Sequence, residues 1–435
     1  MNSSILIDIS QLRVGMYIQL DVGWMHHPFP VSSFRIASAE QIATLRGLGL
    51  AEVRYFPKKS DPGLQEIVPA AWNVADMAEP ASAGSNEAAA AQATAAADPE
   101  ARRRRELLEA QNRALAVCDQ RFGAATRQYH ALERTVVDHP DQARASGDAL
   151  VASCVAELLE NGDSVIRLLS EGVGECSALH PINVLVISLL LGRALGMQSA
   201  ELQDLGVAAL LHDLGKLKLP PNLRHPTVSM IPMERTRYES HVAESVALGT
   251  RMGLPDPVLK AIAQHHEMAD GSGFPQRLQG PALSRASQVL ALVNHYDRMC
   301  NPANGVDALT PHEALSVIFA QLKPRFDSVV LGAFIRMMGV YPPGSVVQLV
   351  NDRYAIVASV NSSRPLRPKV IVHDSRVPKE EAPILDLETV PELGIRRSLK
   401  PAQLPRDALD YLSPRRRICY FFERAVLTGS SEGHP

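Results

Sequence analysis

Short runs of alternating apolar and polar residues open the chain. Ile5–Ile9, Tyr17–Val22 and Ala51–Tyr55 alternate with the period of two that half-buried strands show, and Ala39–Leu48 has helical spacing. We therefore expect residues 1–73 to form a small α+β module.

A low-complexity segment separates this module from a helical region. Residues 74–99 are almost entirely Ala, Ser, Glu, Asp, Pro and Gln. This composition cannot bury enough apolar surface to offset the entropy lost on ordering, so it predicts a flexible Ala-rich linker. Residues 100–147 have helical spacing and are interpreted as a helical connector. The arginines at Arg102–Arg105 fit a solvated first turn better than a nucleic-acid patch, because the formal net charge of the chain is −3.

Residues 148–340 have the pattern of successive helices. Pro- or Gly-marked breaks separate their apolar runs, and we expect no strand of any length among them. They predict an all-α domain of ordinary size. Beyond them, Ser345–Val350 and Tyr354–Val360 predict a β-hairpin, and Lys369–His373 predicts a third strand. Residues 341–435 are therefore interpreted as a β-hairpin extension with a partly disordered tail, and the whole chain as mainly α.

Composition narrows the class of protein. The chain has 435 residues and is 46% hydrophobic, enough for a sizeable core. Its five cysteines are scattered without a C-x-x-C pair, so neither a disulfide framework nor a zinc-thiolate site is expected. The N-terminus lacks a signal-peptide pattern, and the most apolar stretch, Ile182–Gly192, is too short to span a bilayer. We expect a cytoplasmic protein with no membrane span and no nucleic-acid polymer as partner.

An adjacent His-Asp pair on an apolar helix is the first chemical signal. His212 and Asp213 follow four apolar residues, and a buried carboxylate is costly unless it is paired or bound to a cation. Imidazole nitrogen and carboxylate oxygen suit Fe, Mn, Ni or Zn. Lys216, three residues beyond Asp213, is expected on the same helix face, where an ammonium can hold a phosphate or protonate a leaving oxygen.

A second histidine cluster follows in the same helical region. His265 and His266 are expected at a helix end, and His180 and His241 lie near the starts of two other predicted helices. The intervals between these histidines suit successive antiparallel helices. A hydrogen-bonded core role would be favoured for any one histidine alone, but the combination favours a metal site. A Gly-rich turn follows the pair and contains Asp270, Gly271, Gly273, Phe274 and Pro275.

These segments resemble the HD-GYP family of bacterial cyclic di-GMP phosphodiesterases. HDLGKLKLP at residues 212–220 matches the family's His-Asp motif, and HHEMADGSGFP at residues 265–275 matches its signature with one change. The resemblance covers about residues 165–338. QLRVGMYIQLDVGWMHHPF at residues 11–29 also resembles a small domain of unknown function that precedes a subset of HD-GYP modules.

The resemblance implies two divalent metal ions, Fe or Mn in preference to Ni or Zn. One ion would be held by His180, His212 and Asp213, and Asp213 would bridge to a second held by His241, His265 and His266. Asp213 and Lys216 would be catalytic, with Lys216 contacting the scissile phosphate while a bridging water is activated. Cyclic di-GMP would be opened to linear pGpG and/or GMP.

The chain departs from the family pattern in four places. Asn294 stands where the family has an Asp ligand, and a neutral amide oxygen binds metal less strongly; Asp297 is expected to support or cap rather than ligate. Residues 301–305 lack the arginine that helps family members to hold the phosphate. Cys176 occupies the position of a glutamate that gives some members a third metal, and Phe274 replaces the tyrosine of the signature.

Two classes of function remain open, and an active phosphodiesterase in bacterial second-messenger signalling is favoured by the full set of ligands. The alternative is a catalytically weak or inactive cyclic di-GMP sensor or partner-binding scaffold, which Asn294 and the missing arginine support. A third candidate is an HD-type hydrolase of another nucleotide. Besides cyclic di-GMP, a GGDEF-type or other signalling protein and a second copy in a homodimer are compatible partners.

Overall fold

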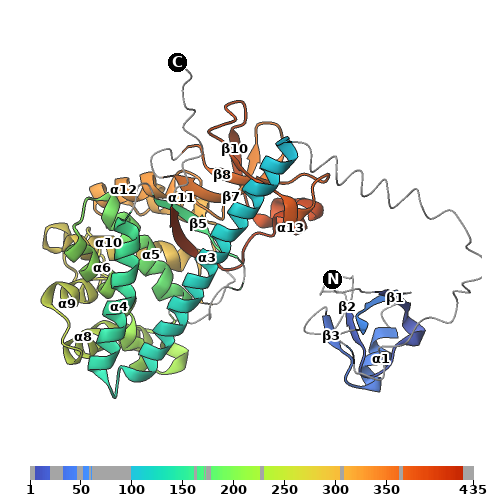
Figure 1. Ribbon diagram of the computed structural model, residues 1–435. Coiled ribbons are helices and arrows are strands. Elements are labelled where there is room, and N and C mark those ends of the chain that lie inside the picture. The colour runs from blue at the N-terminus through green and yellow to red at the C-terminus, as the bar shows by residue number, and fades with distance from the viewer. Residues whose placement is uncertain are drawn as a thin grey trace, which may run out of the picture. The chain divides into compact units, whose positions relative to one another are not determined.

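The computed structural model describes residues 5–19, 33–46, 52–57, 60, 99–160, 164–170, 172, 178–225, 230–303, 308–361 and 366–424. The chain divides into two compact units, Met1–Thr94 and Ala95–Pro435, each described here by itself (Figure 1). Of the linker predicted at residues 74–99, residues 74–98 lie outside the described residues, and Pro99 is the first residue of the helix α3 (Pro99–Thr135). Residues 425–435 also lie outside the described residues.

The N-terminal unit is an antiparallel sheet with one helix. Its strands β1 (Ile5–Asp8), β2 (Tyr17–Gln19), β3 (Ser33–Arg35) and β4 (Glu52–Tyr55) are ordered β1-β4-β2-β3, with α1 (Ala39–Arg46) between β3 and β4. Alternate residues such as Ile7, Ile18 and Val53 are buried in a small core that also contains Leu45 of α1. The predicted α+β elements are confirmed; β3 was not predicted from the sequence.

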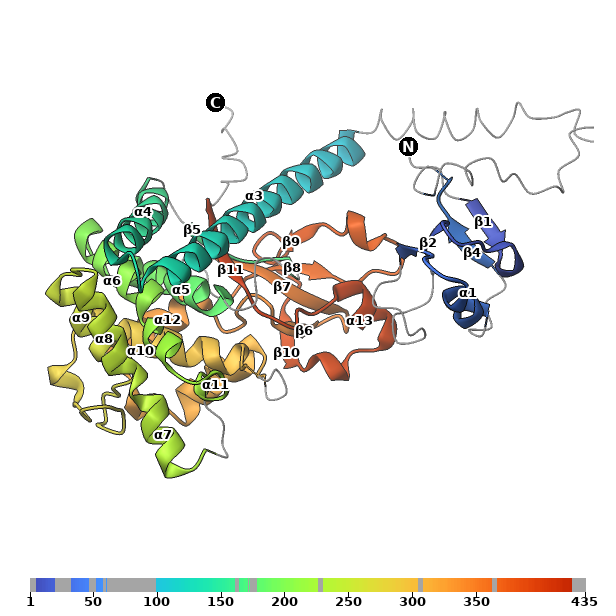
Figure 2. The same cartoon turned by 90° about the horizontal axis from the view of Figure 1, so that it is seen from below.

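The second unit is mainly helical, as predicted. Its helices are α3 (Pro99–Thr135), α4 (Pro140–Leu159), α5 (Leu179–Ala194), α6 (Ser199–Leu211), α7 (Pro232–Glu239), α8 (His241–Arg251), α9 (Asp256–Ala263), α10 (Arg285–Cys300), α11 (Pro311–Ala320) and α12 (Ser328–Met338). Residues 181–192 of α5 are all buried, because α4, α6, α10 and α12 pack around this helix (Figures 1 and 2). An apolar helix without a polar face is typical of such a central position.

A seven-stranded antiparallel sheet completes the second unit. It contains β5 (Ser164–Leu168), β6 (Val346–Leu349), β7 (Tyr354–Asn361), β8 (Lys369–Val372), β9 (Ile384–Asp386), β10 (Ile395–Leu399) and β11 (Tyr420–Arg424). Strands follow the order β10-β6-β7-β5-β11, and β8 joins β7 to β9. A short helix, α13 (Arg406–Leu412), precedes β11 and lies near β7 (Figure 2). The predicted hairpin and third strand are confirmed as β6, β7 and β8.

The expectation that no strand interrupts residues 148–340 is wrong. β5 lies in this region, and both of its partners, β7 and β11, come from beyond it. A five-residue strand gives little alternation, and its pairing with residues far along the chain leaves no local signal. The region after residue 340 is likewise more than a hairpin extension: one hydrophobic core runs from Cys118 to Phe422 and joins this sheet to the helices. The predicted boundary at residues 147 and 148 falls inside α4.

No helix in the described ranges combines the length and the apolar character needed to cross a membrane.

Candidate metal centre

Helix ends and turns bring the predicted ligands together. Asp213 lies on the turn between α6 and the 3-10 helix Leu214–Lys218, where the sequence pattern predicted a continuous helix. Around it stand His180 from α5, His212 directly after α6, His241 as the first residue of α8, and His265 and His266 just after α9. Their ligand atoms form two groups, Asp213 with His241, His265 and His266, and Asp213 with His180 and His212. Within each group these atoms lie within 4.8 Å of one another.

Close packing of the turn against α8 holds Asp213 between the histidines. A side chain at Gly215 would place its Cβ 2.1 Å from the carbonyl oxygen of His241, so only glycine permits this approach. The amide of Gly215 donates to Ser245 Oγ at 2.8 Å. The sequence Asp213-Leu214-Gly215 therefore fixes the distance between the aspartate and the histidine that opens α8.

Each oxygen of Asp213 faces one histidine group. Oδ2 lies 3.6 Å from His180 Nε2 and 3.3 Å from His212 Nε2. Oδ1 lies 3.4 Å from His241 Nε2 and 3.7 Å from His265 Nε2. The carboxylate thus occupies the position from which one residue can serve two cation sites.

Three of the histidines are oriented by their own turn of backbone. The Nδ1 atoms of His212, His241 and His265 each contact the carbonyl oxygen three residues earlier, at 2.8, 2.6 and 2.6 Å. A carbonyl only accepts, so Nδ1 carries the proton and Nε2 presents a lone pair to the centre. This is the tautomer that ligates metal through Nε2.

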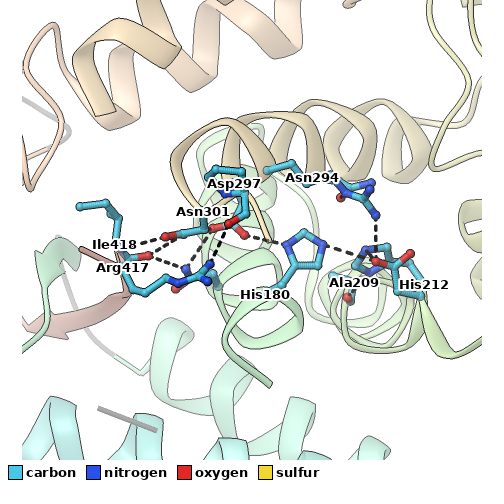
Figure 3. Close-up of polar contacts among 12 residues, drawn as sticks. His180, Ala209, His212, Asn294, Asp297, Asn301, Arg417 and Ile418 are labelled. Carbon is cyan, nitrogen blue, oxygen red and sulfur yellow. Dashed lines mark hydrogen bonds and ion pairs between the residues drawn. The ribbon is translucent and has the colours of Figure 1, made fainter. Parts of the chain in front are cut away.

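His180 is oriented by a side-chain network instead (Figure 3). Its Nδ1 lies 2.6 Å from Oδ2 of the buried Asp297. Oδ1 of Asp297 accepts from Asn183 Nδ2 at 3.0 Å and from Asn301 Nδ2 at 2.9 Å, and both amides also donate to the carbonyl of Ile418. Asp297 therefore lies behind a histidine of the centre, in the supporting position that the sequence suggested. Asn183, Asn301 and Ile418 were not predicted, because their contacts join residues far apart in the chain.

Several buried lone pairs of the centre have no partner among the described residues. They are Nε2 of His180, His212 and His266, and Oδ1 of Asp213. Buried polar atoms are rarely left unsatisfied because desolvation is then uncompensated. Nitrogen and oxygen lone pairs aimed at one point are what a divalent cation of the Fe, Mn, Ni or Zn type binds. The residues present therefore fit a metal centre.

Burial keeps the imidazoles in their neutral, ligating form. Desolvation lowers the pKa of His180 and of His241, lowers that of His265 to about 3, and lowers that of His266 well below its ordinary value. Burial would raise the pKa of Asp213, but the charges of Lys216 and Arg298 hold it well below its usual range. Neutral histidines around an ionised carboxylate are ready to bind a cation without first losing protons.

Two cations share one oxygen of Asp213. Lys216 Nζ lies 2.6 Å and Arg298 Nη2 lies 3.0 Å from Oδ2. Burial and the charge of Arg298 lower the pKa of Lys216 to about 8. Arg298 also donates through Nε to Asn294 Oδ1 at 2.8 Å and through Nη1 to the Tyr238 hydroxyl at 2.7 Å. Arg298 was not predicted from the sequence, although its place four residues after Asn294 on one helix puts both on the same face.

The Gly-rich turn supports the second histidine group. Phe274 stacks on His266 with ring centroids 4.4 Å apart and an interplanar angle of 21°. A Cβ at Gly273 would lie 2.4 Å from the backbone nitrogen of Met268, and Gly271 has φ of 79°, so both positions require glycine. Asp270 accepts from the amide of Ser272 at 2.9 Å, which closes the turn before Pro275. Glycines and the aromatic ring therefore act together by holding His266 in place.

His295, the neighbour of Asn294 in the sequence, is not part of either ligand group. His295 packs against Phe326 with ring centroids 5.6 Å apart, on a different side of α10 from Asn294. Cys176, which stands at the position of a third-metal ligand, falls outside the described residues.

Comparisons with known proteins agree with this site. The HD domain family model matches residues 163–330, and a model of a domain of unknown function (DUF3391) matches residues 4–146. The chain is 26% identical over 391 residues to "Cyclic di-GMP phosphodiesterase PA4108" of Pseudomonas aeruginosa, and the aligned region covers 88% of each protein. It is 20% identical over 192 residues to "Cyclic di-GMP phosphodiesterase PdeB" of Borreliella burgdorferi, covering 44% of this chain and 51% of that protein.

A solved structure described as Bd1817, a HDG"Y"P protein from Bdellovibrio bacteriovorus, matches 76% of this chain and 98% of its own, with 15% identity and a TM-score of 0.43. The helical domain and its histidine-aspartate cluster define a metal-dependent phosphodiesterase with an HD domain. These matches confirm the resemblance to the HD-GYP family that the sequence shows.

Proposed function

We propose that this chain hydrolyses cyclic di-GMP to linear pGpG and/or GMP. The observation that carries the proposal is the position of Asp213, with a histidine group on each carboxylate oxygen and two cations beside it. The names of PA4108 and PdeB, both cyclic di-GMP phosphodiesterases, support the choice of substrate. Such a site suits an anionic phosphodiester better than a neutral substrate.

The ligand roles follow from the two groups. His180, His212 and Asp213 would hold one ion, and Asp213, His241, His265 and His266 the other. When bound, two divalent ions of the Fe or Mn type, or Ni or Zn, acidify a water and neutralise charge on the phosphoryl oxygens. Asn294 contributes differently from the sequence expectation: its Oδ1 accepts from Arg298, so we assign it to positioning that guanidinium rather than to a metal.

Lys216 and Arg298 supply the remaining chemistry. Arg298 is always charged and presents several donors, which suits phosphate oxygens. It would take the role of the arginine that residues 301–305 lack. Lys216, with a pKa of about 8, can give a proton to a leaving oxygen near neutral pH. These two side chains would therefore bind the scissile phosphate and assist departure of the leaving group.

Turnover by the purified full chain tests the proposal. Metal-replete protein would be incubated with cyclic di-GMP, 3′3′-cGAMP and linear pGpG in separate reactions, and products separated by chromatography. We expect cyclic di-GMP to be consumed fastest. The 3′3′-cGAMP reaction is included because a relative from Vibrio cholerae, 25% identical over 173 residues, is named a 3′3′-cGAMP-specific phosphodiesterase. Faster turnover of 3′3′-cGAMP, or binding of cyclic di-GMP without any hydrolysis, would overturn the assignment.

A further inference from the structure

The centre has a charge asymmetry that predicts unequal metal binding. We propose that the His241–His265–His266 half binds its ion tightly, whereas the guanidinium of Arg298 competes with the ion of the His180–His212 half. The inference rests on the proposed function only in taking the cluster to be a two-metal site. Arg298 thereby controls how many ions the centre holds.

The two oxygens of Asp213 carry different neighbours. Oδ2, which faces His180 and His212, also accepts from Lys216 at 2.6 Å and from Arg298 at 3.0 Å. Oδ1 faces His241 and His265, and no Lys or Arg contacts it among the ion pairs of the described residues. An ion entering the first half must therefore share its only carboxylate oxygen with two positive charges, and an ion entering the second half need not.

Arg298 cannot easily leave this position. Three of its nitrogens are occupied, by Asp213 Oδ2, by Asn294 Oδ1 and by the Tyr238 hydroxyl. Its side chain is 23% exposed, and a guanidinium does not lose its charge in proteins. Lys216 differs, because its ammonium is carried on a flexible chain and contacts Asp213 Oδ2, so it can move away. Arg298 is therefore the fixed competitor.

Asn294 adds to the asymmetry. An aspartate at this position would offer a negative charge to the guanidinium and to an ion in the His180–His212 half. The amide offers neither, and it uses its oxygen to hold Arg298 beside Asp213. Both residues lie on one face of α10, so two positions on a single helix set the charge of this half. Like charges close together in a partly buried site repel strongly.

Metal titration of the full chain tests the inference without substrate. Protein stripped with a chelator would be dialysed against buffered Mn²⁺, and bound manganese counted by elemental analysis. We expect one tight ion per chain and a second bound about tenfold or more weaker. Arg298→Gln should tighten the weaker site about tenfold and leave the tight site unchanged. Arg298→Lys should tighten the weaker site less than Arg298→Gln, because it keeps the positive charge but on a chain that can move away. Asn294→Asp should act in the same direction as Arg298→Gln.

Single-ligand variants assign the two ions to the two halves. His241→Ala should abolish the tight site, and His180→Ala should leave it intact; circular dichroism would confirm that each variant is folded. Two equally tight ions in wild-type protein, or equal behaviour of Arg298→Gln and Arg298→Lys, would overturn the inference. Because manganese is counted directly, a chain that shows the unequal sites but no hydrolysis would contradict the proposed function alone.

Discussion

Four histidines of the centre are held by hydrogen bonds of two different kinds. His212, His241 and His265 each use the carbonyl three residues earlier, so their orientation is set within one turn of chain. His180 instead contacts Asp297, 117 residues away, which is itself held by amides that reach the carbonyl of Ile418. Local support depends on little else in the fold, whereas the support of His180 depends on the C-terminal segment that leads into β11.

This difference makes the region after residue 340 part of the site. Tyr420 is the first residue of β11, the strand that pairs with β5, and Ile418 lies two residues before it. The amide of Tyr420 donates to Asn183 Oδ1 at 3.0 Å. Asn183 is fully buried and bonded through both ends of its side chain. The segment at Ile418 and Tyr420 therefore supports His180, in one half of the centre. The histidines that are held by their own backbone carbonyls do not depend on this segment.

Removal of Asp297 should have the largest effect. Asp297→Ala takes away the acceptor of His180 Nδ1 and leaves the amides of Asn183 and Asn301 without their carboxylate. Loss of such a supporting residue costs about 10- to 100-fold in metal affinity or activity. We expect the loss in the His180 half only, measured by manganese titration. The equivalent loss in the His241 half would show that the two supports are not independent.

Asn183→Ala should act more weakly through the same path. It leaves the amide of Tyr420 without its partner, while the carbonyl of Ile418 still accepts from Asn301. The buried amide left unsatisfied costs about 1–3 kcal/mol of unfolding free energy. Urea denaturation measures this cost. Ser188→Ala on the same helix is the matched control: Ser188 Oγ is buried with no partner among the described residues, so its removal should be close to neutral. Equal destabilisation by both variants would argue against the network.

Tyr420→Phe tests whether β11 supports the centre through the hydroxyl of Tyr420. This hydroxyl lies 3.1 Å from that of Tyr296 and from the carbonyl of Pro343, and it does not contact the Asp297 network. We expect a loss of about 1 kcal/mol in urea denaturation. Metal affinity should stay as in wild type, since the backbone contacts of Tyr420 remain. A fall in manganese binding as large as that of Asp297→Ala would place the hydroxyl in the support of His180.

The smallest effect is expected at a histidine outside the centre. Burial, together with Arg325 and Arg298, lowers the pKa of His295 from 6.5 to about 4. As pH falls, the unfolded chain therefore protonates His295 before the folded chain does. The free energy of unfolding keeps its full value above pH 6.5 and decreases as pH falls toward 4. His295→Gln should make the stability of the chain less sensitive to acid in this window, by about 1 kcal/mol after allowance for solvent screening. An unchanged pH dependence would contradict this.

The sequence predicted what is local. His212-Asp213, His265-His266 and the Gly-rich turn are contiguous motifs, and each places its own side chains through helix ends and glycine turns. Contiguous apolar and alternating patterns likewise predicted α5 and the β6–β7 hairpin. They could not reveal β5, which pairs with β7 and β11, or Asn183, which bonds Asp297 and Ile418. Nor could they reveal Arg298, whose role depends on Asp213 from another segment. Contacts between distant residues leave no periodic pattern along the chain.

The most direct test of the account follows turnover as metal is added. Stripped full-length chain would be loaded stepwise with Mn²⁺, and cyclic di-GMP hydrolysis recorded at each measured number of ions per chain. The account predicts that activity is absent in stripped protein, rises with occupancy, and stays at background in a His212→Ala/Asp213→Ala variant at every manganese concentration. Hydrolysis by the stripped chain, or equal hydrolysis by this variant, would contradict a metal-dependent centre at Asp213.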